Sequence, residues 1–398
     1  MKPPDTYVVR NVRPLGAAPT DILVEGGVIK ARGAGLSAPA GTAAIEGRGR
    51  LALPGLINAH CHLDKTRFGL PWWPHAAGPQ RDSRIPVDRE IRPDLMPSTA
   101  ERARRLCLHM AELGTTHIRS HVDVEPEFGL AAVDALLEMR AGLEGGPIVE
   151  LVAFPQFGLL TNPGTAALLE AACRAGAECV GGIEPSVIDG DAEAHLDTVF
   201  AIAERTGAGI DIHLHESGEV GAASLAMICE RTRALSMAGR VAVSHAFCLG
   251  TVADARAGAL IDAMAEAGVA VVTYAPGNSP VPDLKRMEAA GVTVALGTDG
   301  IRDVWTPYGD GDMLERAMML AYRLGYRRDE DIELALDAAI TGGAKVMGLA
   351  DHGLAVGCAG RILLVDAETP AEAVCVHPAS VQAVGFLSVN SISPPGNR

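Results

Sequence analysis

The chain has 398 residues, of which 48% are hydrophobic and 4% aromatic, and its formal net charge at pH 7 is −15. This length and composition predict one large domain and a smaller one, with a mainly aliphatic core. The acidic balance argues against nucleic acid and anionic membranes as partners, because both require a basic surface.

The cysteines and the apolar segments bear on where the protein works. The eight cysteines are scattered, and no two of them form a C-x-x-C pair. In a chain of this size that spacing is typical of reduced thiols in a cytoplasm. The segment MKPPDTYVVR lacks the apolar region of a signal peptide, and no apolar run is long enough to span a bilayer. We therefore expect a cytoplasmic protein that does not engage a membrane.

Both ends of the chain contain short strand-like runs separated by turns. These runs occupy residues 6–12, 21–33 and 51–55 near the N-terminus, and residues 360–367, 371–378 and 381–389 near the C-terminus. We expect the two ends to pair into one small β-sandwich domain, formed by residues 1–53 and 346–398.

The middle of the chain, residues 54–345, alternates short apolar runs with longer segments of helical period. The apolar runs are 56–62, 116–124, 148–156, 179–186, 209–216, 241–247, 269–276 and 292–299. The helical segments are 99–114, 130–142, 165–176, 195–207, 222–239, 261–268 and 283–291. The Pro-rich stretch 71–97 is expected to be a long loop after the first strand.

Eight apolar strands alternating with helices predict an α/β fold of the TIM type, a parallel (β/α)8 barrel. An open, doubly wound sheet is the alternative. That fold usually carries a Gly-rich phosphate loop after its first strand, and no G-x-G-x-x-G follows any of these strands. The barrel is therefore favoured.

Polar side chains gather at the carboxyl ends of the predicted strands, where a barrel of this type carries its chemistry. These ends supply His60, His62, His121, Asp123, Gln156, Glu184, His213, His215, Glu216, His245 and Asp299. Core histidines with only a structural role would be scattered along the chain and would not gather at one end of the strands. The pattern therefore favours a metal-dependent enzyme.

The motif INAHCHLDKT, residues 57–66, supplies the first two of these histidines. On a strand, His60 and His62 point to the same side and can reach one point in space. With His213 and Asp299 they form a chemically sensible ligand set of three imidazoles and one carboxylate. That set would hold one divalent ion and leave room for water.

Two further groups at the strand ends suit acid–base chemistry. A bound metal lowers the pKa of its water from about 15.7 toward about 7. Glu216, three residues after His213, could then transfer the proton of that water, and His245 could orient or polarise it. A hydroxide with a proton shuttle is suited to attack on a C=N or C=O carbon and to expulsion of a leaving group.

Six motifs of the chain resemble the amidohydrolase superfamily, and within it the cytosine deaminase-like branch. They are PGLINAHCHLDKT, RSHVDVEP, VAFPQFGLL, HLHESGEVG, VSHAFCLG and GTDGIRDVWTPYGDGDM. The resemblance covers essentially the whole chain. It implies one divalent ion, Zn(II) or Fe(II), held by His60, His62, His213 and Asp299. Binuclear relatives usually carry a carboxylated lysine at strand four, where this chain has Glu184, so a mononuclear site is favoured.

The same resemblance implies roles for the other site residues. Glu216 would be the proton shuttle, and His245 and Asp299 would take up the protons of the water. Gln156 would hydrogen-bond the amide-like edge of a ring, and Trp305 would close over that ring. We expect the partner to be a small-molecule nitrogen heterocycle and the assembly to be a homo-oligomer.

Two positions depart from the cytosine deaminase pattern. Gly300 stands where those enzymes have a second Asp lining the pocket, so we expect extra space that would suit a substituted ring. Lys65 resembles the N-isopropylammelide hydrolases, which remove an alkylamine from a triazine ring. Lys65 could contact an electronegative ring atom of the substrate or pair with a carboxylate such as Asp64. Glu184 could contact the substrate or form a salt bridge inside the barrel mouth.

Three functional hypotheses follow. The first is a metal-dependent hydrolytic deaminase of a cytosine-like, possibly 5-substituted, pyrimidine that releases ammonia. The second is a hydrolase of an N-alkylamino-triazine or of another cyclic amidine or amide. The third is a non-catalytic barrel for binding or assembly, which is disfavoured because no ligand and no shuttle is missing. The roles of three more residues stay open: His121 with Asp123 either orients a ligand or forms a structural pair, and His215 contacts substrate or caps the barrel end.

Overall fold

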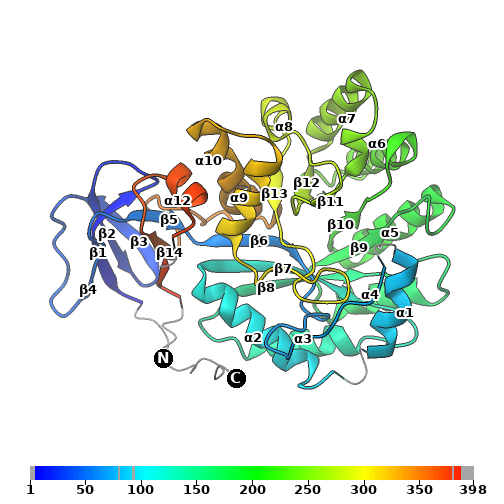
Figure 1. The fold of residues 1–398 in the computed structure, drawn as a ribbon, viewed down its shortest axis with the longest axis horizontal. Coiled ribbons are helices and arrows are strands. Elements are labelled where there is room, and N and C mark those ends of the chain that lie inside the picture. Colours follow the sequence, from blue (N-terminus) through cyan, green and yellow to red (C-terminus); the bar gives the residue numbers. More distant parts are fainter. Residues whose placement is uncertain (1–4, 79–80, 92–94, 379–380, 387–398) are drawn as a thin grey trace.

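The computed structural model describes residues 5–78, 81–91, 95–378 and 381–386, and its largest feature is a parallel eight-stranded sheet that curls into a barrel (Figure 1). The strands are β6 (Leu56–Cys61), β7 (Thr115–Asp123), β8 (Ile148–Phe154), β9 (Cys179–Ile183), β10 (Gly209–His213), β11 (Val241–Ser244), β12 (Val269–Thr273) and β13 (Val294–Leu296). Each predicted apolar run overlaps one of them, so the predicted barrel is confirmed. Strands buried on both faces require such continuous apolar runs.

The first and last barrel strands meet where the predicted site lies. Cys61 forms an isolated parallel bridge with Asp299. The backbone N–H groups of Thr298 and Asp299 both lie 2.9 Å from the carbonyl oxygen of His60 and donate to it. Barrel closure therefore brings residues about 240 positions apart in the sequence to adjacent places at one end of the sheet.

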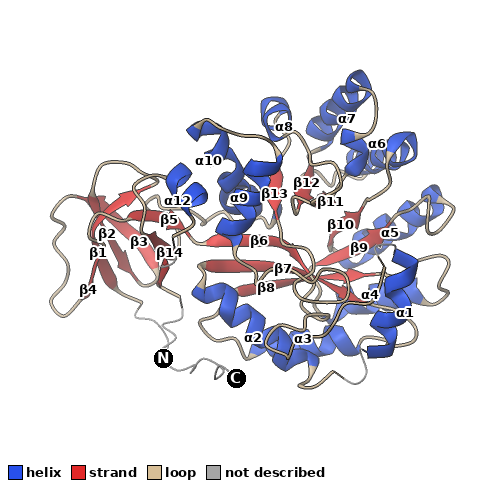
Figure 2. Ribbon diagram, in the orientation of Figure 1, coloured by secondary structure: helices blue, strands red, loops and turns tan. Residues whose placement is uncertain are grey.

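Helices surround the strands on the outside (Figure 2). Seven of them overlap the predicted helical segments: α2 (Thr99–Glu112), α3 (Ala131–Ala141), α4 (Thr165–Ala175), α5 (Ala192–Thr206), α6 (Gly218–Ala234), α7 (Asp254–Ala267) and α8 (Leu284–Ala290). Helix α5 shows how the sequence sets such limits. The side chain of Asp191 accepts a hydrogen bond from the N–H of Ala194 at its start, and Gly207 ends it with a φ of 75°.

Other helices were not predicted. They are α1 (Arg81–Ile91), the 3₁₀ turn η2 (Phe247–Gly250), α9 (Met313–Arg323), α10 (Asp329–Asp337), the π-helical turn η3 (Ala338–Gly342), α11 (Gly343–Val346) and α12 (Pro370–Val376). Two of them correct the sequence-based expectations. Helix α1 lies in the stretch expected to be a loop, and its polar sequence with an internal Pro86 hides it from periodicity. Helix α12 replaces the strand expected at 371–378, because Thr369 caps it and Pro370 suits its first turn.

The two chain ends form a smaller sheet beside the barrel, on the left in Figure 1. It contains β1 (Tyr7–Pro14), β2 (Thr20–Glu25), β3 (Val28–Gly33), β4 (Ala43–Glu46), β5 (Leu51–Pro54), β14 (Ile362–Val365) and β15 (Val381–Val384). Strand β14 pairs antiparallel with β5 and joins the C-terminal segment to the N-terminal one. The flanking sheet predicted from both ends is thus confirmed. Strand β4 was not predicted, and the end of the last predicted strand, 387–389, lies outside the described residues.

The structure also bears on the cysteines and on the apolar segments. All eight cysteines are free thiols in the structure. Within the described parts of the chain, every helix is too short or too polar to cross a bilayer.

Candidate metal centre and active site

Three of the predicted metal ligands converge at the carboxyl end of the barrel. His60 lies on β6, His62 follows that strand, and His213 ends β10. One ligand atom from each of the three lies within 4.8 Å of the others. The ring centroid of His60 lies 5.4 Å from that of His62 and 4.6 Å from that of His213. The alternation of side chains along β6 therefore does bring both imidazoles to one point.

The fourth predicted ligand, Asp299, lies beside His60 and His62, and it also forms a close group with His60 and His245. Its Oδ1 lies 3.2 Å from Nε2 of His62 and 3.6 Å from Nε2 of His60. Its backbone has a φ of 61°, a left-handed conformation that is uncommon outside glycine. The carboxylate is therefore held toward the histidines by a turn that directly follows the last barrel strand.

The protonation states of this cluster suit a metal ion. Burial lowers the pKa of His62 to about 4 and holds the pKa of His213 well below its usual value. Burial by itself would raise the pKa of Asp299, but the adjacent imidazoles of His60 and His62 hold it well below its usual value. Neutral imidazoles and an ionised carboxylate are the forms that bind divalent metals.

The hydrogen-bond inventory agrees with this fit. The buried Nε2 of His60 and both ring nitrogens of His213 have no hydrogen-bond partner among the residues that the structure describes. Buried polar atoms are normally satisfied, so a group of such orphans requires an explanation. Three imidazoles and one carboxylate are a donor set that suits a divalent cation.

His245 and His215 form the wall beside this cluster. His245 follows β11 with a φ of 79°, and its ring centroid lies 5.0 Å from that of His213. The ring of His215 stacks on His245, with centroids 4.3 Å apart and an interplanar angle of 16°. Nδ1 of His215 lies 2.7 Å from Oε1 of Glu184. The two uncertain residues Glu184 and His215 are therefore paired with each other at the barrel mouth.

Glu216, the predicted proton shuttle, is buried and held by three hydrogen bonds. Its Oε1 accepts from the backbone N–H groups of Ser186 and Val187, each at 2.8 Å, and its Oε2 accepts from the Ser224 hydroxyl at 2.7 Å. These partners belong to the loop after β9 and to α6. Among the described residues, the structure gives Glu216 no hydrogen bond to the histidines.

Three of the predicted substrate-binding residues come together on the other side. Nζ of Lys65 donates to Oε1 of Gln156 at 2.6 Å and lies 2.8 Å from Oδ1 of Asp123. It also lies 5.5 Å from the centroid of the Trp305 ring. Asp123 is thus an ion-pair partner of Lys65. His121 instead lies against the metal ligands, with its ring centroid 4.1 Å from that of His60, so the two do not form the structural pair considered above.

The space expected beside Gly300 is absent, which corrects the sequence-based prediction. A Cβ atom at Gly300 would lie 2.5 Å from Oδ2 of Asp303. The Asp303 side chain fills the position, and its Oδ1 accepts from the N–H groups of Trp305 and Thr306. Its Oδ2 is buried without a partner, and burial raises the pKa of this carboxyl to about 7. Asp303 was missed, although it lies inside the quoted motif GIRDVW.

Two more polar residues lie beneath the cluster, and the sequence did not single them out. Ser244 ends β11 and Asp211 lies in the middle of β10. Oγ of Ser244 lies 2.8 Å from Nδ1 of His60 and 2.7 Å from Oδ1 of Asp211. The only sequence signal for them is a polar residue inside an otherwise apolar run.

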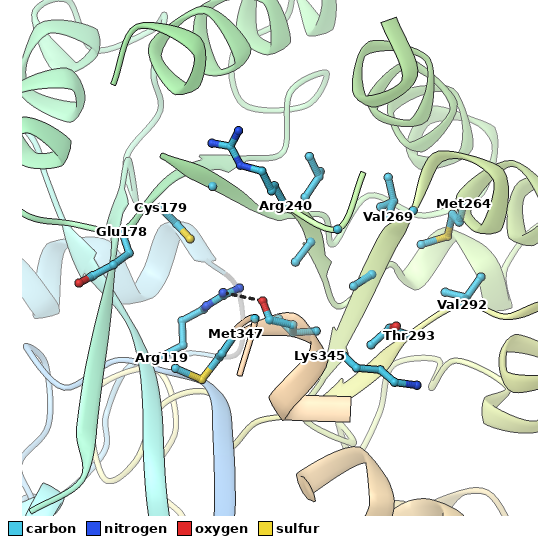
Figure 3. Close-up of a pocket in the computed structure, with 18 of the residues that line it drawn as sticks. Arg119, Glu178, Cys179, Arg240, Met264, Val269, Val292, Thr293, Lys345 and Met347 are labelled. Carbon is cyan, nitrogen blue, oxygen red and sulfur yellow. Dashed lines mark hydrogen bonds between the residues drawn. The ribbon is translucent and has the colours of Figure 1, made fainter. Parts of the chain in front are cut away.

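A cavity of about 330 Å³ lies at the opposite, amino-terminal end of the barrel. Figure 3 shows Arg119, Arg240 and Lys345 among the side chains around it. Gly209 and Val269, which start β10 and β12, also line it. This cavity is therefore separate from the histidine cluster.

Comparison with known proteins adds independent information. A model of the family described as "Amidohydrolase family" matches residues 88–387. The Escherichia coli (strain K12) protein named "Uncharacterized protein YahJ" is 36% identical over 333 residues, which cover 82% of this chain and 72% of that protein.

Two solved structures are similar over nearly the full length. N-isopropylammelide isopropylaminohydrolase from Burkholderia multivorans ATCC 17616 has a TM-score of 0.92 and 46% identity, and the match covers 96% of this chain and 98% of that one. 5-methylcytosine deaminase from Klebsiella pneumoniae, liganded with 5-fluorocytosine, has a TM-score of 0.84 and 26% identity, covering 98% and 100%.

Proposed function

This chain belongs to the amidohydrolase family, and from that premise we propose that it is a metal-dependent hydrolase that displaces an amine from an amino-substituted nitrogen heterocycle. The observation that carries the proposal is the convergence of His60, His62, His213 and Asp299, with buried ring nitrogens that lack hydrogen-bond partners. A purely structural cluster would have satisfied those atoms within the protein.

In this proposal the four residues hold one divalent ion, Zn(II) or Fe(II). When bound, the ion lowers the pKa of a water toward about 7. Asp299 and His245 would take up the protons of that water, since both lie at the cluster and burial holds the pKa of His245 well below its usual value. A neutral imidazole at this position is ready to accept a proton.

Two residues are candidates for delivering the proton to the leaving nitrogen. Glu216 is favoured by the resemblance, but its carboxylate already accepts three hydrogen bonds from protein groups. His215 is supported by geometry, because Glu184 orients its Nδ1 and its ring stacks on His245. In either case the water oxygen bonds to the ring carbon, the C–N bond breaks, and the amine leaves with the added proton.

The residues of the proposed substrate pocket support one leaving group over another. Lys65, anchored by Asp123 and Gln156 and facing Trp305, is suited to an electronegative ring that carries oxygen or nitrogen acceptors. Together with 46% identity to an N-isopropylammelide isopropylaminohydrolase, it favours an alkylamine leaving group on a triazine-type ring. The second candidate, release of ammonia from a cytosine-like ring, is supported by Glu216 and by the similarity to 5-methylcytosine deaminase. The Gly300 argument for a 5-substituted ring loses its basis.

The test is an amine-release screen with zinc- or iron-loaded protein. N-isopropylammelide, other N-alkylamino-triazines, cytosine and 5-methylcytosine are compared, and both alkylamine and ammonia are quantified. We expect alkylamine from a triazine. Ammonia from a pyrimidine would move the proposal to the deaminase, and metal-loaded protein without turnover on any of these rings would refute both.

The proton donor is tested by two conservative variants. Glu216→Gln and His215→Asn are compared for metal content, kcat and pH profile. If His215 is the donor, His215→Asn lowers kcat at least about 100-fold with metal retained, in keeping with the usual size of general acid catalysis. Loss confined to Glu216→Gln would assign the role to Glu216.

A further inference from the structure

Three buried side chains connect the cavity at the amino-terminal end of the barrel to His60. Arg119 donates from Nη1 to Oδ2 of Asp211 at 3.1 Å. The hydroxyl of Ser244 donates to Oδ1 of Asp211 at 2.7 Å, and Nδ1 of His60 lies 2.8 Å from the same hydroxyl oxygen. Asp211 and Ser244 are fully buried, so bulk water does not compete for these hydrogen bonds.

The donors and acceptors in this series of hydrogen bonds determine which nitrogen of His60 carries the proton. A carboxylate accepts hydrogen bonds only, so the single hydroxyl proton of Ser244 must point to Asp211. The Ser244 oxygen can then only accept from His60, which requires a proton on Nδ1. Nε2 is left with its lone pair, and this atom is buried, lacks a hydrogen-bond partner and faces Asp299.

Arg119, at the other end of this series of hydrogen bonds, sets the direction in which they are donated. The Arg119 guanidinium keeps its protons, so it can only donate. Besides Asp211 it donates to Oε1 of Glu150 and to the carbonyl oxygen of Val346, each at 2.9 Å. Figure 3 shows the bond to the Val346 carbonyl beside α11, which carries Lys345. Arg119 is therefore fixed from three sides and holds Asp211 as an acceptor.

We propose that Asp211 and Ser244 are positioning residues that keep His60 protonated on Nδ1 and thereby leave Nε2 free to bind the metal. The inference deepens the proposed function and rests on it in one respect, namely that His60 is a metal ligand. Hydrogen-bond partners of ligating histidines generally fix the tautomer and the ring orientation, and their loss costs 10–100-fold in metal affinity.

Two substitutions separate this role from simple packing. Ser244→Ala removes the acceptor for Nδ1 but imposes no other tautomer. Asp211→Asn reverses the direction of these hydrogen bonds. Arg119 donates to the new amide oxygen, the amide nitrogen donates to Ser244, and the hydroxyl proton turns toward His60. His60 then carries its proton on Nε2, where the metal should bind.

The first measurement is zinc affinity by competition with a chromogenic chelator. We expect about a 10-fold loss for Ser244→Ala and about a 100-fold loss for Asp211→Asn. Asp189→Asn is the matched control, because Oδ2 of Asp189 lies 2.6 Å from Nδ1 of His195 in another buried Asp–His pair. It should leave zinc affinity unchanged. Equal affinities of wild type and Asp211→Asn would overturn the inference.

The second measurement does not depend on metal or turnover. Nitrogen-15 NMR of histidine-labelled, metal-free wild type should show His60 protonated on Nδ1, assigned by the loss of its signals in His60→Gln. Protonation on Nε2 would overturn the inference even if Asp211→Asn does not fold. Wild-type protein with the expected tautomer but without turnover on any heterocycle would refute the proposed function alone.

Discussion

The two ends of the barrel both bury polar groups, but they treat them differently. At the amino-terminal end, Nη2 of Arg240 donates to the carbonyl oxygens of Gly207 and Ala208, and both terminal nitrogens of Arg119 are bonded, although Nε of Arg119 has no partner among the described residues. At the carboxyl end, ring nitrogens of His60, His213 and others are buried without hydrogen-bond partners. An unsatisfied buried polar group costs free energy, so the second arrangement is retained where a ligand compensates for it.

The backbone differs in the same way. Several strands end at the carboxyl side in residues other than glycine with positive φ, among them Glu184, His245 and Asp299. Such conformations are uncommon for these residue types and cluster at functional sites. At the amino-terminal end, turns of positive φ are made by glycines such as Gly239 and Gly268. One end of the barrel is therefore built for stability and the other for chemistry.

The largest expected effect is a loss of metal affinity. It is tested by making the same His→Asn substitution at each end of the barrel. His213→Asn should lower metal affinity more than about 100-fold and abolish turnover, because it removes a proposed ligand. His117→Asn, at the start of β7, should leave metal affinity unchanged. Metal content after dialysis and turnover are measured for both. If His213→Asn keeps its metal, the proposed ligand set is wrong.

The amino-terminal end is tested through stability. Arg119→Met leaves the buried carboxylate of Asp211 without its cation and should cost about 3–5 kcal/mol in the free energy of unfolding. Arg140→Met is the control, since its pair with Glu178 is partly exposed and should contribute about 0.5 kcal/mol. Urea unfolding measures both. Equal losses would mean that burial of the ion pair does not matter here.

The pH dependence of stability follows from two histidines near the small sheet. Burial lowers the pKa of His117 to about 3 and that of His352 to about 4. The unfolded chain therefore binds their protons first, so stability is fully present above about pH 6.5 and falls as the pH drops toward these values. Each histidine contributes up to about 1.4 kcal/mol per pH unit. Urea unfolding of metal-free protein between pH 7 and 4 should show a shallower decline for His117→Gln. An unchanged slope would contradict this.

The smallest effect concerns the filled pocket beside Asp299. Gly300→Ala places a methyl group 2.5 Å from Oδ2 of Asp303 and should cost about 1–3 kcal/mol with a higher KM. Gly277→Ala, which meets no atom within 4 Å, is the control. Thermal unfolding and steady-state kinetics measure both. A stable Gly300→Ala with improved activity on substituted rings would restore the idea of extra space.

Much of this protein is determined by local sequence patterns. The eight apolar runs and seven helical segments predict the barrel, because strand and helix periodicities are properties of short windows. The four proposed ligands follow from one rule, that chemistry lies where parallel strands end. Alternation along β6 further predicts that His60 and His62 share a face.

Only the tertiary structure decided what these residues contact. The side chain of Asp303 occupies the space beside Gly300. Asp303 lies three positions further along, after a turn that no local pattern predicts. The partners of Lys65, Glu216 and His215 lie on other strands and loops. Asp211 and Ser244 look in sequence like isolated polar residues in apolar strands. Barrel closure places them under His60, because the relative positions of side chains from different strands depend on the register and curvature of the whole sheet.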